Sequence, residues 1–200
     1  RVLPASEHLS WIPNGAVKLR PWSSENPPIS VPTILKNAAS KFPNNIALSV
    51  YRNDDWKKWT FEQYYEDSRT TAKAFIELGL EPFKSVNVIG YNAPEYYLAY
   101  QGGIMAGGFA AGIYMTNGAS ALQFVSNHSR GQIMVVEDDL QLQKVLAVRD
   151  QLPELKAIVQ WSGKPTVSGV LTWDELMDIG RRSDDSALEE RLANMAVNQC

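Results

Sequence analysis

Hydrophobic and polar positions along this chain follow short apolar runs separated by helical periods. Residues 86–89 form an apolar run with β-branched side chains, which predicts a core strand. Asn92 is placed to cap a following helix, with Pro94 and Glu95 in its first turn as in a capping box. After a second apolar run at residues 111–116, the pattern is that of a β-α-β unit.

The helix of this unit lies in a stretch without charge. Residues 96–129, which are 34 in number, include no Asp, Glu, Lys or Arg, whereas 20% of the whole chain is charged. Small residues recur every fourth position at Ala99, Gly103 and Gly107, and Gly107 with Gly108 is placed to end the helix. We therefore expect the helix to be buried on most sides and closely approached by another backbone.

The same alternation continues on both sides of this unit. Thr60 with Gln63, and Ser186 with Glu189, have the spacing of capping boxes. Helices are expected at 32–40, from 61 to Gly79, at 119–127, 139–151, 173–179 (bounded by Gly180) and from 186; strands are expected at 47–52, 56–60, 132–137 and 156–160, the first two joined at Asn53–Asp55 as a hairpin.

Strands that alternate with helices of this length predict an α/β fold with a largely parallel sheet flanked by helices. Residues 1–30, rich in Pro, Ser and Trp, read as an extended N-terminal arm, with Trp11 and Trp22 as candidates for packing. Residues 31–200 read as part of an α/β domain. The chain begins with Arg1 and shows no signal-like segment, so we expect it to be a fragment or a processed product.

Composition excludes several classes of function. The net charge of −3, with 19 scattered basic residues, gives no electrostatic surface for nucleic acid. Two histidines and one cysteine do not complete a zinc site, and a single cysteine excludes an internal disulfide and suits a reducing compartment. A membrane span in the uncharged stretch is disfavoured, because glycine and polar residues interrupt it and no Lys/Arg cluster flanks it.

Candidate catalytic patterns are also weak. The glycines between 102 and 112 fit neither the dinucleotide-binding nor the phosphate-loop spacing, so close packing explains them better. His128 beside Ser129 reads as a helix-terminal histidine rather than as part of a nucleophilic pair. The acidic cluster of residues 184, 185, 189 and 190 lies among arginines and reads as a solvated helix face.

Several short blocks of the sequence occur in a characteristic order. They are Trp59–Tyr64 (WTFEQY), Ala72–Leu80 (AKAFIELGL), Gly90–Tyr96 (GYNAPEY), Ala106–Gly108 with Gly112–Asn117 (GIYMTN), Val135–Asp138 (VVED) and Leu155–Trp161 (LKAIVQW). Together they resemble the adenylate-forming long-chain acyl-CoA synthetases, in particular their bubblegum branch. The chain departs from that family at Tyr96, where Trp is usual, and at residues 118–120, where Gly-Ala-Ser replaces Ser-Pro-Glu.

The resemblance implies a ligase that joins a long-chain fatty acid to coenzyme A with ATP and Mg²⁺, through an acyl-adenylate. It places the phosphate loop after the strand that residues 196–200 would enter, and the other catalytic parts further on. No catalytic or metal-binding residue is therefore expected within this chain, and the fragment alone is expected to be inactive. The family also implies a cytoplasmic enzyme, with peripheral association with the endoplasmic reticulum or another intracellular membrane left open.

The resemblance leaves one candidate site in the chain. Tyr114, Thr116 and Asn117 lie at the carboxyl end of a predicted strand, where ligands gather in open α/β sheets. These three residues are the candidates for facing the nucleotide or the acyl substrate. Two alternatives to a long-chain ligase remain at this stage: a noncatalytic α/β binding or scaffold module, and an adenylate-forming ligase of different acyl specificity.

Overall fold

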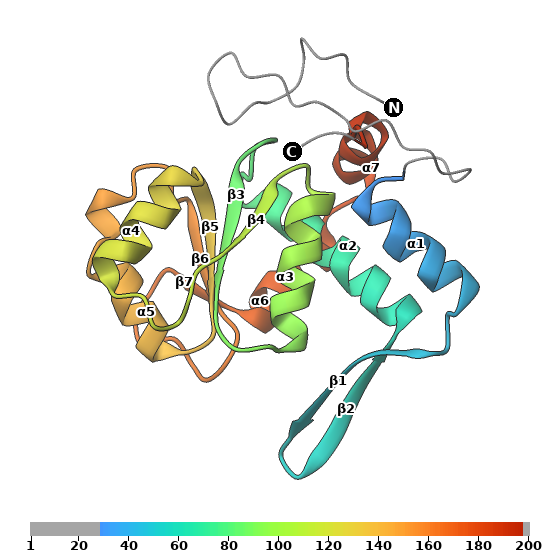
Figure 1. Cartoon of the computed structure of the whole chain (residues 1–200), viewed down its shortest axis with the longest axis horizontal. Coiled ribbons are helices and arrows are strands. Elements are labelled where there is room, and N and C mark those ends of the chain that lie inside the picture. Colours follow the sequence, from blue (N-terminus) through green and yellow to red (C-terminus); the bar gives the residue numbers. More distant parts are fainter. Residues whose placement is uncertain (1–28, 198–200) are drawn as a thin grey trace, which may run out of the picture.

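The computed structural model describes residues 29–197, and a five-stranded parallel sheet forms its centre (Figure 1). Its strands lie in the order β4-β3-β5-β6-β7, so the chain leaves β3 first to one side and then to the other. The predicted α/β class and largely parallel sheet are confirmed. The strands are β3 (Ser85–Ile89), β4 (Phe109–Gly112), β5 (Gly131–Val136), β6 (Ala157–Gln160) and β7 (Val170–Thr172), of which β7 was not predicted.

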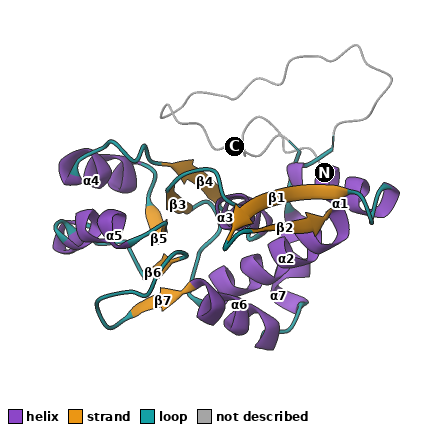
Figure 2. Ribbon diagram, turned by 90° about the horizontal axis from the view of Figure 1, so that it is seen from below, coloured by secondary structure: helices purple, strands orange, loops and turns teal. Residues whose placement is uncertain are grey.

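Helices cover both faces of the sheet (Figure 2). The larger layer contains α2 (Phe61–Glu77), α3 (Pro94–Met105) and α6 (Trp173–Arg182), with α1 (Val31–Lys41) and α7 (Ser186–Asn194) packed against α2. The smaller layer contains α4 (Ala119–His128) and α5 (Asp139–Leu146). The two helix layers cover the faces of the sheet, and the ends of its parallel strands lie outside these layers.

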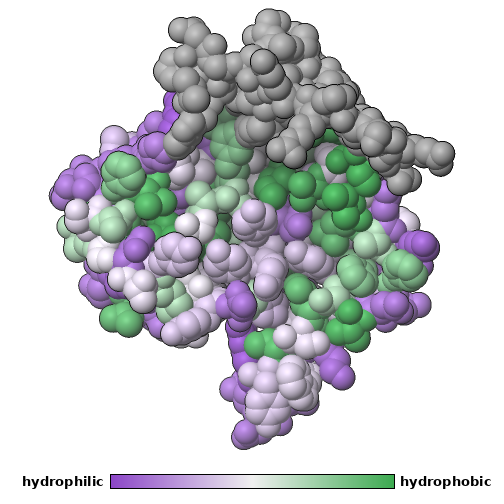
Figure 3. All heavy atoms as spheres, viewed as in Figure 1, coloured by the Kyte–Doolittle hydropathy of each residue, from purple (hydrophilic) through white to green (hydrophobic). Residues whose placement is uncertain are grey.

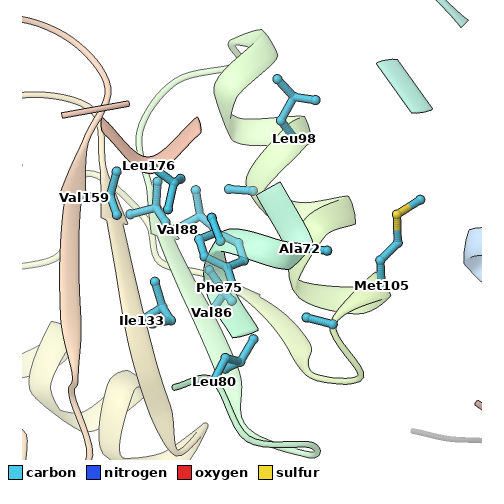
Figure 4. Close-up of a cluster of buried hydrophobic side chains, with 14 of the residues drawn as sticks. Ala72, Phe75, Leu80, Val86, Val88, Leu98, Met105, Ile133, Val159 and Leu176 are labelled. Carbon is cyan, nitrogen blue, oxygen red and sulfur yellow. The ribbon is translucent and has the colours of Figure 1, made fainter. Parts of the chain in front are cut away.

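The central strands are buried on both faces because their side chains alternate between two apolar clusters. Val86 and Val88 of β3 pack with Phe75 and Leu176 from the larger helix layer (Figure 4). Ile89 of the same strand packs instead into the cluster under α4 and α5. Such burial explains why the central strands read as continuous apolar runs in the sequence.

A hairpin projects from this body in Figure 1. Its strands are β1 (Ile46–Arg52) and β2 (Asp55–Thr60), and Asn53 and Asp54 both adopt positive φ angles of 53° and 58°. Two successive residues with positive φ make the tight turn that matches the twist of a hairpin. The predicted hairpin is confirmed, although Asp55, expected in the turn, pairs with Arg52 in the strands.

The helix caps confirm one prediction and correct two. Thr60 and Gln63 form the expected capping box at the start of α2. The predicted Asn92 cap of α3 is wrong: Ala93 occupies the N-cap without a side-chain bond, and the Glu95 carboxylate accepts two hydrogen bonds from Arg52 instead. The box predicted for α7 is also wrong, because its Glu189 binds Arg69, at 2.7 Å.

A capping box is present where none was predicted. Thr172 and Glu175 form it at the start of α6. That helix runs to Arg182, so Gly180 lies inside it rather than at its end. Capping-box spacing therefore predicts the start of a helix only where no other residue binds the capping carboxylate, as arginines bind Glu95 and Glu189.

Two further boundaries differ from the predictions. The second strand of the charge-free unit spans residues 109–112 rather than 111–116, because Gly108 lies so close to the Lys84 carbonyl that pairing with β3 starts at Phe109. The helix predicted over 139–151 ends at Leu146 and is followed by a single 3₁₀ turn, Arg149–Gln151. Pro153 explains only where this turn stops, since the residue before a proline, here Leu152, avoids helical geometry.

Burial of the α3 helix is less complete than predicted. Gly102 and Gly103 do allow close approach, because a Cβ atom would lie 2.7 Å from Thr71 and 3.0 Å from Val86 respectively. Tyr97 and Tyr100, however, are 41% and 39% exposed on the opposite side of the helix. The charge-free sequence therefore marks a helix buried on one side with an aromatic outer face.

The acidic cluster at residues 184–190 was expected to form a solvated helix face, and the structure corrects this. Asp185 forms ion pairs with Lys73 and Arg69 of α2, and Glu189 binds the same arginine. These exposed carboxylates therefore hold α7 against α2 rather than forming only a solvated face.

Several expectations fall on residues that the structure does not describe. They are the extended arm up to residue 28, with Trp11 and Trp22, and the end of the strand expected at 196–200. Residues 195–197 follow α7 without joining a strand. Within residues 29–197, no helix is long and apolar enough to cross a membrane.

Candidate functional site

A hollow of about 490 Å³ opens at the carboxyl ends of β3 and β4. Two loops form it: one leads from β3 into α3, and the other leaves β4 toward α4. Because β3 and β4 are parallel, their ends bring residues near 90 and near 114 together although more than 20 positions of sequence separate them. The lining residues are Gly90, Tyr91, Asn92, Tyr96, Gly112, Ile113, Tyr114, Met115 and Thr116.

Residues from other elements hold the two loops around the hollow in place. The Glu137 carboxylate accepts a hydrogen bond from the backbone N–H of Tyr91 at 2.8 Å. Lys144 of α5 donates to the backbone carbonyl of Met115 at 2.5 Å. Gly90 is a position of close approach, since a Cβ atom there would lie 2.2 Å from the indole of Trp161. The walls are therefore fixed by residues from other elements.

The lining itself is uncharged. It contains hydroxyl, amide and apolar side chains but no Asp, Glu, Lys or Arg. Burial, with neighbouring Tyr100 and Tyr97 adding to it, raises the pKa of the Tyr96 phenol, so this group stays neutral. A hollow of this kind provides hydrogen bonding and apolar contact but no counter-charge for a phosphate or a carboxylate.

The structure separates the three predicted site residues. Tyr114 and Thr116 line the hollow, and Tyr114 is 81% exposed. Asn117 does not line it; its backbone N–H bonds to the Tyr114 carbonyl and closes the turn. All three lie beyond the end of β4 rather than within a strand, because that strand starts and ends earlier than predicted.

Sequence reasoning missed half of this site. The lining also comes from the loop after β3 and the first turn of α3, which carry Tyr91, Asn92 and Tyr96. The site candidates from the sequence, however, all lie in the loop after β4. The signal was present in the sequence, since parallel neighbouring strands place their carboxyl ends at one edge.

A metal or nucleotide site is not evident within residues 29–197. That part of the chain holds no group of three His, Cys, Asp or Glu side chains able to bind a metal ion. His128, weighed in the sequence as a catalytic candidate, stacks on Phe124 with ring centroids 5.5 Å apart, which fits a structural role.

Comparison with known proteins gives the chain a family. The model of the family described as AMP-binding enzyme matches residues 35–195. The chain is 40% identical to the long-chain-fatty-acid–CoA ligase ACSBG2 of Xenopus laevis, over 99% of this chain and 28% of the relative. It is 35% identical to ACSBG1 of Rattus norvegicus, over 99% and 28% of the two chains. The chain thus spans just over a quarter of the length of these relatives.

Solved structures support the fold. An anthranilate CoA ligase in complex with anthranoyl-AMP matches 80% of this chain and 29% of its own, with 21% identity and a TM-score of 0.68. A structure described as that of a putative long-chain-fatty-acid CoA ligase from Rhodopseudomonas palustris matches 80% of this chain and 37% of its own, with 14% identity and a TM-score of 0.66. The resemblance stated from the sequence blocks is confirmed, and the chain belongs to the AMP-binding enzyme family.

Proposed function

We propose that the protein carrying this sequence is a long-chain fatty acid–CoA ligase and that this chain supplies part of its N-terminal α/β domain. The observation that carries the proposal is the 40% identity to a ligase of that class across 99% of the chain. In such a reaction the fatty carboxylate attacks the α-phosphate of ATP, releasing pyrophosphate and giving an acyl-adenylate. The thiolate of coenzyme A then attacks the acyl carbon, and AMP leaves.

Activation of this kind has a clear chemical reason. A carboxylate is a poor acyl donor because oxide would have to leave, whereas in the adenylate the leaving group is a stabilised phosphate. The enzyme must hold two anions together and keep water from the adenylate. Mg²⁺ and the ATP phosphates would be bound mainly by other parts of the protein, because in the family that the chain resembles the phosphate loop follows the strand that residues 196–200 would enter.

The role of this chain would be to bind and orient substrate rather than to react with it. Tyr114 and Thr116 are proposed to face a substrate, because they line the hollow at the carboxyl edge of the sheet. Asn117 would contribute indirectly by closing the turn that carries Tyr114. Residues 1–30 are proposed to form an arm and residues 31–200 the partial domain.

A location in the cytoplasm, with peripheral contact with an intracellular membrane, follows from the same proposal. Its long-chain substrate partitions into lipid, which makes a membrane surface the natural source of that substrate. The single cysteine of the sequence agrees with a reducing compartment.

The experiment is an assay of the full-length enzyme for pyrophosphate release and thioester formation, with ATP, Mg²⁺, coenzyme A and a panel of acids. Release that depends on a long-chain fatty acid such as palmitate is expected, and acetate and anthranilate serve as controls for acyl class. Preference for a short or aromatic acid, or no acid-dependent release, would overturn the proposal. The 200-residue chain alone is expected to give none.

A further inference from the structure

We propose that the α1–hairpin surface, formed by the exposed side chains of residues 29–60, docks the full-length enzyme on an anionic lipid membrane. The inference rests on the proposed function, because it assigns a surface to the membrane contact proposed there. The surface includes α1 and the β1–β2 hairpin, which follow each other along the chain. Both lie on the side of the molecule away from β6 and β7 (Figure 1).

Exposed apolar side chains are concentrated on this surface. Residues 29–60 make up less than a fifth of the described chain, yet they carry seven of its fifteen exposed large hydrophobic side chains. Val31 and Ile34 lie on the side of α1 that faces solvent. On the hairpin, Tyr51 and Trp56 are cross-strand partners, with ring centroids 5.6 Å apart, and both are exposed. Apolar surface gathered in this way marks a site of interaction.

The same surface is basic, although the whole chain has a net charge of −3. Residues 29–60 contain four lysines and one arginine but only two acidic residues. Arg52 is paired with Glu95, whereas the lysines are exposed. Lys41 Nζ lies 5.1 Å from the ring centroid of Phe42, so charge and apolar surface are adjacent. The four lysines are Lys36, Lys41, Lys57 and Lys58.

A lipid surface suits this combination of side chains. Apolar (green) and charged (purple) side chains lie next to each other over α1 at the right of Figure 3. Aliphatic and aromatic side chains enter the interface of a membrane, and Trp and Tyr are the aromatic residues enriched there. Lysine contacts lipid with its alkyl stem and keeps its ammonium group among the anionic headgroups and water.

A protein partner suits the surface less well. Burial against protein would remove water from the lysine ammonium groups, which costs free energy unless each gains a partner. A second copy of the chain presents the same lysines, and like charges repel. Contact between copies should therefore be the weaker interaction, formed where lipid is absent.

Co-sedimentation of the full-length enzyme with vesicles tests the basic part of the surface. We expect binding to phosphatidylcholine vesicles that contain about one quarter phosphatidylserine, and weaker binding at high salt. The double variant Lys36→Gln/Lys41→Gln should bind these vesicles about 25-fold more weakly, because each lysine near an anionic surface contributes about fivefold. Its binding to pure phosphatidylcholine should change little.

Ile34→Gln tests the apolar part. Binding to both kinds of vesicle should fall about tenfold, because an aliphatic side chain is withdrawn from lipid. Leu140→Gln is the matched control, since Leu140 is equally exposed on a helix, α5, that covers the other face of the sheet. Thermal melting shows whether the variants fold. If Ile34→Gln does not, the lysine variant decides, because both of its lysines are exposed.

Two results would contradict the inference. One is a full-length enzyme that binds the anionic vesicles while the Ile34 and lysine variants bind as tightly as Leu140→Gln, since another surface then contacts the lipid. The other is a wild type that binds neither kind of vesicle; a dimer that Ile34→Gln dissociates would then identify a second copy as the occupant. An enzyme that binds vesicles through this surface but joins no fatty acid to coenzyme A would contradict the proposed ligase activity alone.

Discussion

At the scale of single residues, glycine allows helices to pack closely because it has no Cβ atom. Gly180 lies within α6, where a Cβ atom would come 2.0 Å from the backbone carbonyl oxygen of Thr70 in α2. The sequence suggested the opposite role, that of a helix end, because a glycine after an amphipathic stretch usually marks a terminus. Only the packing of α6 on α2 shows why the helix continues through it.

Gly180→Ala is expected to destabilise the fold. In an exposed helix the same change stabilises by about 1 kcal/mol, since alanine is the better helix former. Here the clash with backbone has to push α6 away from α2, which costs roughly 1–3 kcal/mol as overpacking does. Urea denaturation of the chain measures the change. Gly118→Ala is the control for an added methyl group that meets no neighbour, because a Cβ atom at this N-cap of α4 has nothing within 4 Å. A more stable Gly180→Ala variant would show that the helices do not pack this closely.

Asp67 makes the stability depend on pH in an unusual direction. Burial raises the pKa of its carboxyl above the ordinary value of 3.8, and the hydrogen bond from Trp59 Nε1, 3.1 Å long, only partly offsets this. The folded state therefore binds this proton more tightly than the unfolded state, so its contribution to stability is lost as pH rises through the folded pKa.

Asp67→Asn should remove that loss while keeping an oxygen for Trp59. The variant's stability relative to the wild type is expected to be greater at neutral pH than near pH 4, as measured by urea denaturation at both values. A relative stability that is the same at the two pH values would mean that Asp67 is hydrated in the folded protein.

At the scale of elements, the strongest local signals predicted the structure and the weaker ones failed where a tertiary partner intervened. The α2 capping box and the hairpin turn depend on neighbouring residues and were predicted. The α3 cap was not, because Glu95 is drawn to Arg52 of the hairpin by two hydrogen bonds of 2.6 and 2.9 Å. This ion pair joins the projecting hairpin to the first turn of α3.

Arg52→Met is expected to loosen that junction. It leaves the Glu95 carboxylate, whose side chain is only 11% exposed, without its partner, and such a change costs roughly 1–3 kcal/mol. Adding Glu95→Gln should restore part of the loss, since no buried charge remains. Arg181→Met is the control, because its ion pair with Asp178 is exposed and should contribute less than about 0.5 kcal/mol. Equal losses from both arginine changes would contradict a special role for the junction.

At the scale of the whole molecule, two apolar clusters fill the space on either side of the sheet, yet apolar side chains also gather on the surface. The green surface at the right of Figure 3 lies over α1, where Ile34 and Val31 are 55% and 46% exposed. Exposed apolar side chains three positions apart on a helix, as these two are, favour association between molecules. We expect the 200-residue chain to self-associate in solution.

Ile34→Glu should reduce this association without altering the fold. Glutamate is a good helix former and position 34 contacts solvent, so stability should change by no more than about 0.5 kcal/mol. Size-exclusion chromatography with light scattering over a range of concentrations measures the effect. A wild-type chain that stays monomeric throughout would contradict the expectation.

The α/β class, the central strands and most of the helices could be predicted from the sequence, because these depend on periodicity and on turn residues within a few positions of one another. It also predicted that Tyr114 and Thr116 follow the end of a strand, where they line the hollow; their facing a substrate stays a prediction. Only the tertiary structure brought the loop after β3 against the loop after β4, assigned Asn117 to the turn, and gave Glu95 to Arg52 instead of a cap. These outcomes depend on which distant groups meet in space, and the order of strands in the sheet decides that.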